Sequence, residues 1–208
     1  MDTITVLQRA IRLRDPHTAH HQDRVAAMSA ALGIQLGWDA ERIEQARRGG
    51  LVHDLGKLAV PVSILNRPGP LSSNEYELIK EHPIFGVQVL TEDQRPPSDV
   101  VMIIEQHHER LDGSGYPNHL VASDINESAQ IVAIADVFEA MTSRWSYRLE
   151  NTLAASLDEL HAGRGTSYHG DGVDALVALI EGHALDEAQD AWPILPVDDV
   201  KYPWQDSP

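Results

Sequence analysis

The sequence predicts an all-α fold, organised as a single-domain helical bundle, and three of its features support this. Apolar residues recur at helical spacing along nearly the whole chain, whereas no segment alternates strictly as a half-buried strand would. Aromatic residues make up only 5% of the 208 residues, although hydrophobic residues make up 42%. The apolar bulk is therefore mostly Leu, Ile, Val and Ala, which suits packed helices better than a β-sandwich. A chain of this length is by default one compact domain.

The first helices are marked by apolar spacing and by residues that favour helix starts. Residues 1–14 are expected to form an N-terminal helix with apolar side chains every three or four positions. A second helix is expected to begin at Asp15 and Pro16, a cap residue followed by the proline that suits the first helical position, and to run toward Gly37. Asp39 is expected to cap a third helix that ends near LVHDLGK.

The later helices follow from one capping motif and from apolar stretches. Ser72 and Glu75 form a capping-box pattern before YELIKEH, and Pro83 is expected to kink or restart the helix there. Buried helices are expected in VVMIIEQHHE and ESAQIVAIADVFEAMTS, and two more helices in NTLAASLDELHAG and GVDALVALIEGH. Residues 184–208 are acidic and contain prolines, and we expect them to form a loosely structured C-terminal tail.

Net charge and cysteine content exclude several classes of function. The formal net charge is −16, whereas binding to a DNA or RNA duplex needs a basic face. Because the chain has no cysteine, disulfides, thiolate zinc sites and cysteine nucleophiles are excluded. No stretch is long and apolar enough to cross a bilayer, and the N-terminus lacks the apolar stretch and cleavage site of a signal peptide. We therefore expect a cytoplasmic protein with no membrane partner.

Histidines and aspartates that interrupt apolar helices are the candidate functional residues. One of them, Asp136, lies within IVAIADVFEA, and a buried carboxylate there needs a counter-charge or a metal ion. A single histidine on an apolar helix is usually a core residue, but seven such donors together suit two adjacent metal ions. Asp54 directly follows His53, so its carboxylate could bridge the two ions. Nitrogen and oxygen donors without sulfur favour Mn, Fe, Ni or Co, and Zn also fits. The seven donors are His21, His53, Asp54, His82, His107, His108 and Asp136.

Several motifs resemble, in order, those of one family of phosphohydrolases. VHDLGK resembles the His-Asp doublet of the HD superfamily of metal-dependent phosphohydrolases, and HHERLDGSGYP resembles the signature of its HD-GYP branch. RDPHTAHHQDRV, VPVSILNRPGPLSSNEYELIKEHPIFG and IADVFEAMTSRWSYR are similar to further segments of that branch. The resemblance covers roughly residues 11 to 180, so the joint pattern is far more specific than the doublet alone.

The resemblance implies a helical bundle of the HD-GYP type, with residues 15–183 as the catalytic domain. It also implies hydrolysis of the second messenger cyclic di-GMP to linear pGpG or GMP, at two or three metal ions that are often iron or manganese. The seven donors match the family's metal ligands by position. Asp54 and Lys57 are expected to be catalytic, with Lys57 also contacting the scissile phosphate while a metal-activated water attacks phosphorus in line. The residues expected to shape the loop around the substrate are Gly115, Tyr116 and Pro117.

Three positions depart from the family's pattern. His17 lies one turn before His21 on the same side of the helix, where it is either a ligand for a third metal ion or a polar substitute for the family's common aromatic residue. We favour the second interpretation. Trp145 stands where the family has an arginine that helps to hold substrate phosphate, while Arg148 remains as a substrate-binding residue. Glu139 replaces a common aspartate and is given no role.

Two other functions stay open from the sequence. The first is an HD phosphohydrolase that acts on another cyclic dinucleotide, such as a mixed GMP-AMP ring. The second is a catalytically weak receptor that binds the nucleotide without cleaving it, and the Trp145 substitution keeps this hypothesis open. The expected partners are a cyclic dinucleotide substrate and, for regulation, a second copy of the chain or another protein.

Overall fold

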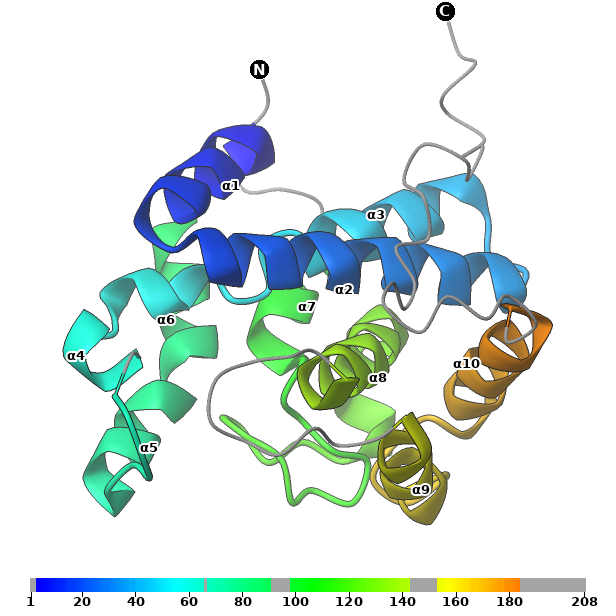
Figure 1. Ribbon diagram of the computed structural model, residues 1–208. Helices are drawn as coiled ribbons and strands as arrows, with labels where there is room; N and C mark the ends of the chain where they lie inside the picture. Colours follow the sequence, from blue (N-terminus) through cyan, green and yellow to red (C-terminus); the bar gives the residue numbers. More distant parts are fainter. Residues whose placement is uncertain (1–2, 66, 91–97, 143–152, 184–208) are drawn as a thin grey trace, which may run out of the picture.

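The structure is a computed structural model that describes residues 3–65, 67–90, 98–142 and 153–183 (Figure 1). Within these ranges the chain is helical, and its only β-type pairings are two isolated bridges, so the predicted all-α class is confirmed. The predicted tail, Trp145 and Arg148 lie outside the described residues. The elements are α1 (Thr3–Arg14), α2 (Pro16–Gln35), α3 (Ala40–Gly50), η1 (Leu55–Ala59), α4 (Val62–Leu65), α5 (Ser73–Lys80), α6 (His82–Val89), α7 (Ser98–Gln106), η3 (Ala122–Asp124), α8 (Glu127–Thr142), α9 (Leu153–Ala162) and α10 (Gly170–His183).

The predicted start of α2 is confirmed at the level of single hydrogen bonds. The Asp15 side chain accepts from the backbone N–H groups of His17 and Thr18, at 3.1 Å each, and Pro16 occupies the first turn. These bonds satisfy amides that have no partner inside the helix. The chain therefore ends α1 at Arg14 and starts α2 two residues later, as the cap residue and the proline predicted.

The other predicted helix starts are also confirmed. The Asp39 side chain accepts from the backbone N–H of Arg42 at 2.8 Å. Ser72 and Glu75 bond reciprocally as a capping box at the start of α5. Because Pro83 lies in the first turn of α6, the chain restarts there as a new helix.

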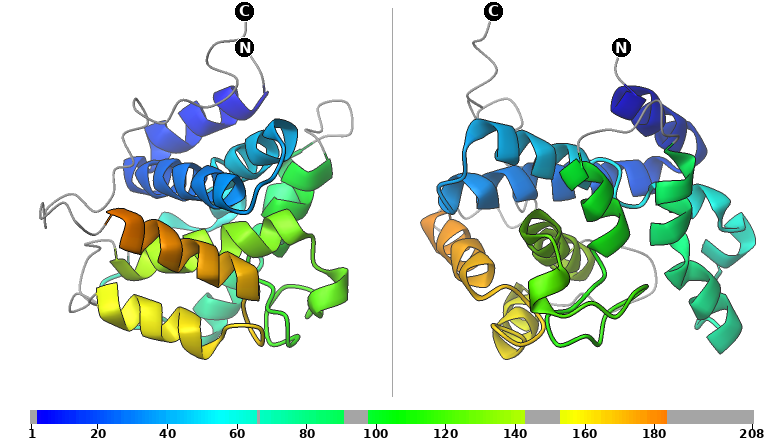
Figure 2. Two further views of the ribbon diagram at one scale, coloured as in Figure 1. Left: turned by 90° about the vertical axis from the view of Figure 1, so that its right-hand side faces the viewer. Right: turned by 180° about the vertical axis from the view of Figure 1, so that it is seen from behind.

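Helix α8 is the central element of the fold. It packs against α2, α3, α7, α9 and α10 (Figure 1), and the view turned by 90° shows α10 lying between α2 and α9 (Figure 2). Phe138 and Ile134 of α8 are fully buried, together with Leu32 of α2, Ile103 of α7 and Leu160 of α9. An element surrounded in this way needs apolar residues on nearly every side, which explains why the segment reads as strongly apolar.

Two glycines bring the His-Asp doublet close to its neighbours. A Cβ at Gly50, the last residue of α3, would lie 2.7 Å from the Cα of Ala26 in α2. A Cβ at Gly56, in η1, would lie 1.8 Å from the carbonyl oxygen of His82 in α6. Only glycine fits at these distances. The segment that carries His53 and Asp54 is therefore held tightly between α2 and α6.

The predicted helix over VVMIIEQHHE ends earlier than expected, because α7 stops at Gln106. The Nδ1 atom of His107 lies 3.0 Å from the carbonyl oxygen of Ile104, the acceptor that a continuing helix would use for the N–H of His108. Both histidines consequently lie in the turn after α7. None of the helices in the described part of the chain is long and apolar enough to span a membrane.

Candidate metal centre

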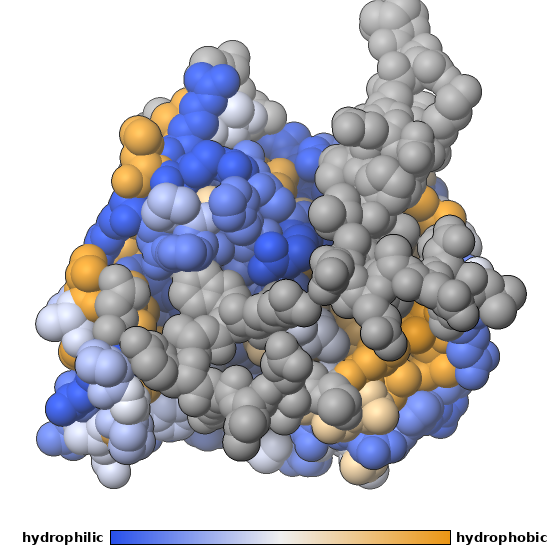
Figure 3. All heavy atoms as spheres, viewed as in Figure 1, coloured by the Kyte–Doolittle hydropathy of each residue, from blue (hydrophilic) through white to orange (hydrophobic). Residues whose placement is uncertain are grey.

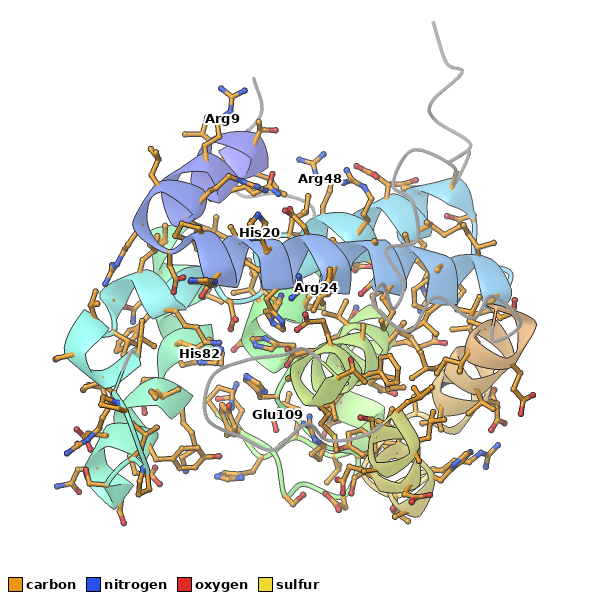
Figure 4. All side chains as sticks on the ribbon, viewed as in Figure 1. Arg9, His20, Arg24, Arg48, His82 and Glu109 are labelled. Atoms are coloured by element: carbon orange, nitrogen blue, oxygen red, sulfur yellow. The ribbon has the colours of Figure 1, made fainter. Side chains whose placement is uncertain are left out.

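The seven predicted donors converge at one place in the fold. His21 comes from α2, His53 and Asp54 from the turn after α3, and Asp136 from α8. The other three, His82, His107 and His108, come from the start of α6 and the turn after α7. The side chains gather between these elements, with His82 and Arg24 on two sides of the cluster (Figure 4). They form three overlapping groups of donor atoms that lie within 4.8 Å of one another: Asp54 with His82, His107 and His108; His21 with His53 and Asp54; and His53 with His107 and Asp136.

Asp54 lies between two pairs of imidazoles. Its Oδ1 atom is 3.3 Å from Nε2 of His82 and 4.0 Å from Nε2 of His107. Its Oδ2 atom is 3.6 Å from Nε2 of His53 and 3.8 Å from Nε2 of His21. Each carboxylate oxygen thus faces its own pair of ring nitrogens, which is the arrangement that a bridging carboxylate between two adjacent cations requires.

Asp136 supplies the second carboxylate of the cluster. Its Oδ1 atom lies 3.0 Å from Nε2 of His21 and 3.6 Å from Nε2 of His53. Its Oδ2 atom lies 3.9 Å from Nδ1 of His108. The aspartate that stands alone in an apolar helix is therefore directed into the histidine cluster rather than into the hydrophobic core.

Backbone carbonyls fix the ring orientation of three histidines. Nδ1 of His53 lies 2.8 Å from the oxygen of Gly50, Nδ1 of His82 lies 2.7 Å from the oxygen of Ile79, and His107 has the contact described above. A carbonyl oxygen can only accept, so Nδ1 carries the proton and Nε2 of the neutral ring carries a lone pair. All three Nε2 atoms point into the cluster, as they do in metal-ligating histidines.

Lone pairs on nitrogen and oxygen atoms that have no hydrogen-bond partner in the described part of the chain show that a cation fits the cluster. Nε2 of His82 and Nε2 of His107 are 3.1 Å apart, and two lone pairs facing each other at that distance repel unless a cation lies between them. Oδ1 of Asp54 is buried and has no hydrogen-bond donor among the described residues. A buried carboxylate oxygen without a partner is costly. The cluster could therefore hold metal ions through nitrogen and oxygen donors.

Two carboxylates, those of Asp136 and Glu139, determine the protonation state of His21. Burial alone would lower the pKa of His21, but hydrogen bonds with Asp136 and Glu139 outweigh it and raise the pKa to about 10. Without metal, a proton on His21 thus supplies positive charge that the two carboxylates need.

The shifted pKa values of His107, His108, Asp54 and Lys57 suit metal binding. Burial and the neighbouring imidazoles lower the pKa of both His107 and His108, so their lone pairs are available at neutral pH. Burial opposes charge on Asp54, but the ammonium group of Lys57, 2.6 Å away, holds the pKa of Asp54 well below its usual range. Burial likewise opposes charge on Lys57, but Asp54 raises its pKa, so Lys57 is a cation beside the cluster.

Glu139 is a residue of the site that the sequence analysis missed. It is buried on α8, its Oε2 atom contacts Nδ1 of His21, and its Oε1 atom accepts from Nε of Arg24 at 2.5 Å. A carboxylate bound to the second ring nitrogen of a metal-ligating histidine orients the ring. One signal was available: Glu139 follows Asp136 by three positions in the same apolar helix, so both carboxylates share a face.

Glu109 is a second residue that the sequence analysis missed. It holds the loop that contains Gly115, Tyr116 and Pro117, called the GYP loop below. Its buried carboxylate accepts from the backbone N–H of Asn118 at 2.6 Å and from that of Leu120 at 3.0 Å. The loop is thereby folded back so that the Tyr116 ring stacks on the His108 ring, with centroids 4.6 Å apart. A Cβ at Gly115 would lie 2.4 Å from the backbone N of Arg110, so this loop also packs tightly.

A cavity of about 350 Å³ opens onto the cluster. Its lining includes His21, Asp54, Lys57, His108 and Asp136. His17 also lines this cavity, although it belongs to none of the three donor groups. Both interpretations of His17, the favoured polar substitute for an aromatic residue and the ligand for a third metal ion, stay predictions. His20 is exposed, as expected, and is labelled on α2 in Figure 4.

Comparison with known proteins agrees with this geometry. The sequence profile of the HD domain matches residues 5–172, which covers most of the chain and includes all seven donors. The chain belongs to the HD domain family. The HD-domain match begins inside α1, so it includes most of the N-terminal helix.

Several curated proteins are similar to this chain. The cyclic di-GMP phosphodiesterase response regulator RpfG of Xanthomonas campestris is 38% identical over 85% of this chain and 47% of its own length. The 3'3'-cGAMP-specific phosphodiesterase 2 of Vibrio cholerae is 36% identical over 82% of this chain and 33% of its own length. The chain thus spans between a third and about half of these relatives.

A solved structure supports the fold and the family branch. Bd1817, an HDG"Y"P protein from Bdellovibrio bacteriovorus, superposes with a TM-score of 0.66 and 26% identity, over 79% of this chain and 52% of Bd1817. Together with the sequence relatives, this match confirms the resemblance to the HD-GYP branch of the HD domain family.

Proposed function

We propose that this chain is a metal-dependent phosphodiesterase that hydrolyses cyclic di-GMP to linear pGpG, GMP or both. The observation that carries the proposal is the position of Asp54, with one oxygen facing His82 and His107 and the other facing His21 and His53. We propose all seven donors as metal ligands. Nitrogen and oxygen donors favour two Fe or Mn ions, while Ni, Co and Zn also fit this donor set.

Lys57 is the proposed catalytic cation. When bound, a pair of divalent cations polarises a phosphoryl oxygen and lowers the pKa of a water molecule, which supplies the nucleophile. Lys57 Nζ donates to Asp54 Oδ2 and borders the cavity, and an ammonium group has two further N–H donors for a phosphoryl oxygen. Its raised pKa keeps it charged at neutral pH, so it stabilises negative charge that develops during the reaction.

The GYP loop is the proposed wall of the substrate site. The Tyr116 ring stacked on His108 places an aromatic face beside the donor cluster, and Glu109 holds the loop in that position. Gly115 and Pro117 flank this tyrosine, and Arg148 is proposed to bind substrate from outside the described residues. A cytoplasmic location likewise stays a prediction.

The test is an assay of products with defined metals. The metal-free protein is loaded with Mn(II) or Fe(II) under reducing conditions, mixed with cyclic di-GMP, and the products are separated by chromatography. Formation of pGpG or GMP supports the proposal. Binding without cleavage under both metal conditions contradicts it and favours a receptor.

A second substrate is included because one relative, 36% identical to this chain, is a 3'3'-cGAMP-specific enzyme. Cyclic di-GMP and 3'3'-cGAMP are compared at equal concentrations. A larger kcat/KM for the mixed ring would assign this chain to that alternative class.

A further inference from the structure

A second, smaller cavity of about 140 Å³ adjoins the larger one on the side away from α8. Because the two cavities share much of their lining, they form one continuous depression rather than two separate sites. The shared residues are Asp15, His17, Thr18, Asp54, Lys57 and Leu65. A ligand held at the donor cluster can therefore extend into the smaller cavity.

The smaller cavity has apolar walls and the size of part of a ligand. Ile11 of α1 lines one side, Leu58 of η1 and Val62 of α4 line the others, and Leu65 is shared with the larger cavity. Its volume is below the ~300–1,000 Å³ of pockets that hold a whole small molecule. It suits one substituent of a larger ligand, and its walls favour an apolar face.

The polar groups around this cavity disfavour an anion. The backbone N–H groups of His17 and Thr18, which would bind a phosphate at the start of a helix, already donate to Asp15. The guanidinium group of Arg14 donates to the carbonyl oxygens of Leu58 and Val60. The carboxylates of Asp15 and Asp54 add negative charge, and the other cation of the lining, Lys57, is shared with the larger cavity and donates to Asp54. The substituent that fits is therefore neutral.

The rim of the cavity can nevertheless form hydrogen bonds. The Thr18 hydroxyl donates to Asp15 Oδ2 at 2.9 Å, which leaves its oxygen able to accept. The Asp15 carboxylate and the His17 ring lie on the same rim. Apolar walls with acceptors at one edge are the surroundings in which proteins hold a nucleobase outside a duplex, with its faces on apolar side chains and its edge hydrogen-bonded.

We propose that the smaller cavity is a nucleobase subsite, which takes one purine of the cyclic dinucleotide while a phosphate lies at the donor cluster and Lys57. This assignment rests on the proposed function and adds to it a determinant of substrate choice, formed by α1, the start of α2 and α4. Residues Val62 and Thr18 are then specificity-determining positions, one through packing and one through hydrogen bonding.

The experiment tests the subsite by placing a larger side chain at the edge of the smaller cavity. Val62 is 50% exposed and lines only the smaller cavity, so Val62→Trp can project into the cavity without disturbing the core. Ser63→Trp is the matched control, because Ser63 is exposed on the same helix, lines neither cavity and points about 100° away. Calorimetry on the Mn(II)-loaded proteins measures the Kd for a phosphorothioate analogue of cyclic di-GMP that resists cleavage. Hydrolysis of bis(p-nitrophenyl) phosphate, a phosphodiester without a nucleobase, is followed in parallel.

The expected result is a Kd weakened at least about tenfold by Val62→Trp and unchanged by Ser63→Trp, with bis(p-nitrophenyl) phosphate hydrolysis retained in both. Equal Kd values for Val62→Trp, Ser63→Trp and the unsubstituted protein overturn the subsite and leave the proposed function standing. If Val62→Trp weakens binding of the analogue but the unsubstituted protein cleaves no cyclic dinucleotide, the subsite is supported and the proposed function is wrong. Failure of the unsubstituted protein to bind the analogue overturns the subsite as well.

Discussion

At the scale of single residues, Asp54 has the most demanding position. It is buried, it faces four imidazoles, and its Oδ1 atom has no hydrogen-bond donor among the described residues. Such a carboxylate is costly to bury unless a cation lies beside it, and Lys57 alone does not satisfy Oδ1. Its substitution should therefore separate metal binding from fold.

For Asp54→Ala we expect metal occupancy and phosphodiesterase activity to be lost while helicity survives. The loss should exceed the ~10–100-fold that is typical when a group behind a metal ligand is changed. Elemental analysis, product chromatography and far-ultraviolet circular dichroism check the three parts. Full activity of the variant would contradict the proposed ligand set.

Glu139 should act through His21. Glu139→Gln keeps the shape of the side chain but removes the charge that holds Nδ1 of His21 and the Arg24 guanidinium. We expect metal affinity to fall ~10–100-fold, with Glu139→Asp retaining part of it. The matched control is Glu44→Gln, which breaks a glutamate–arginine pair with Arg47 away from the site. Equal metal affinity in Glu139→Gln and Glu44→Gln would refute this role.

Proton release offers a test of His21 as a ligand. Its pKa of about 10 in the metal-free protein lies above neutrality, so the ring is protonated at about pH 7.5. A ligating nitrogen must be deprotonated, and metal binding should therefore release about one proton and tighten as the pH rises. Calorimetric titrations in buffers of different ionisation enthalpy count the protons. Binding enthalpies that do not depend on the buffer would exclude His21.

Residue types alone indicated the seven donors, because each is a titratable group in an otherwise apolar segment. The same reasoning overlooked Glu109 and Glu139, since glutamates near helix ends are usually solvated. The spacing of Glu139 from Asp136 was a local signal for one of them, whereas the burial of Glu109 arises only when the GYP loop packs over it, which local sequence does not report.

At the scale of elements, helix spacing and caps predicted most of α1, α2, α3, α5, α6, α8, α9 and α10. They did not predict η1 or α4, because segments of four or five residues are too short to show a period. They also extended α7 through His107 and His108. That helix ends because a side chain takes over a backbone acceptor, and apolar spacing carries no information about such a contact.

The close contact between η1 and α6 at Gly56 predicts how substitution of this glycine changes stability. Gly56→Ala would place a methyl group against the His82 carbonyl, so we expect a loss of about 1–3 kcal/mol of stability and weaker metal binding. Gly182→Ala in α10 meets nothing within 4 Å and should stabilise by about 0.5–1 kcal/mol. Urea denaturation of both variants decides the matter, and equal stabilities would show that the contact at η1 is not tight.

For the whole molecule, the net charge of −16 opposes the approach of an anionic dinucleotide. The surface over α1 and the start of α2 is largely hydrophilic in the view of Figure 3. Attraction must therefore be local, and Lys57 together with the cations that the donor cluster is proposed to hold can supply it. At short range, divalent ions outweigh a diffuse acidic surface.

The wide spacing of the donors along the chain has a mechanical consequence. The proposed ligands at residues 21, 53, 54, 82, 107, 108 and 136 come from five segments, helices and turns, that reach the site independently, so shared ions would hold these five segments together at one point. A cation bound only by the native state adds about 2.7 kcal/mol at a hundredfold excess over its Kd. Melting of the Mn(II)-loaded protein should therefore begin at a higher temperature than after chelation. Amide exchange should slow most in the turns after α3 and α7, where no long helix secures the backbone.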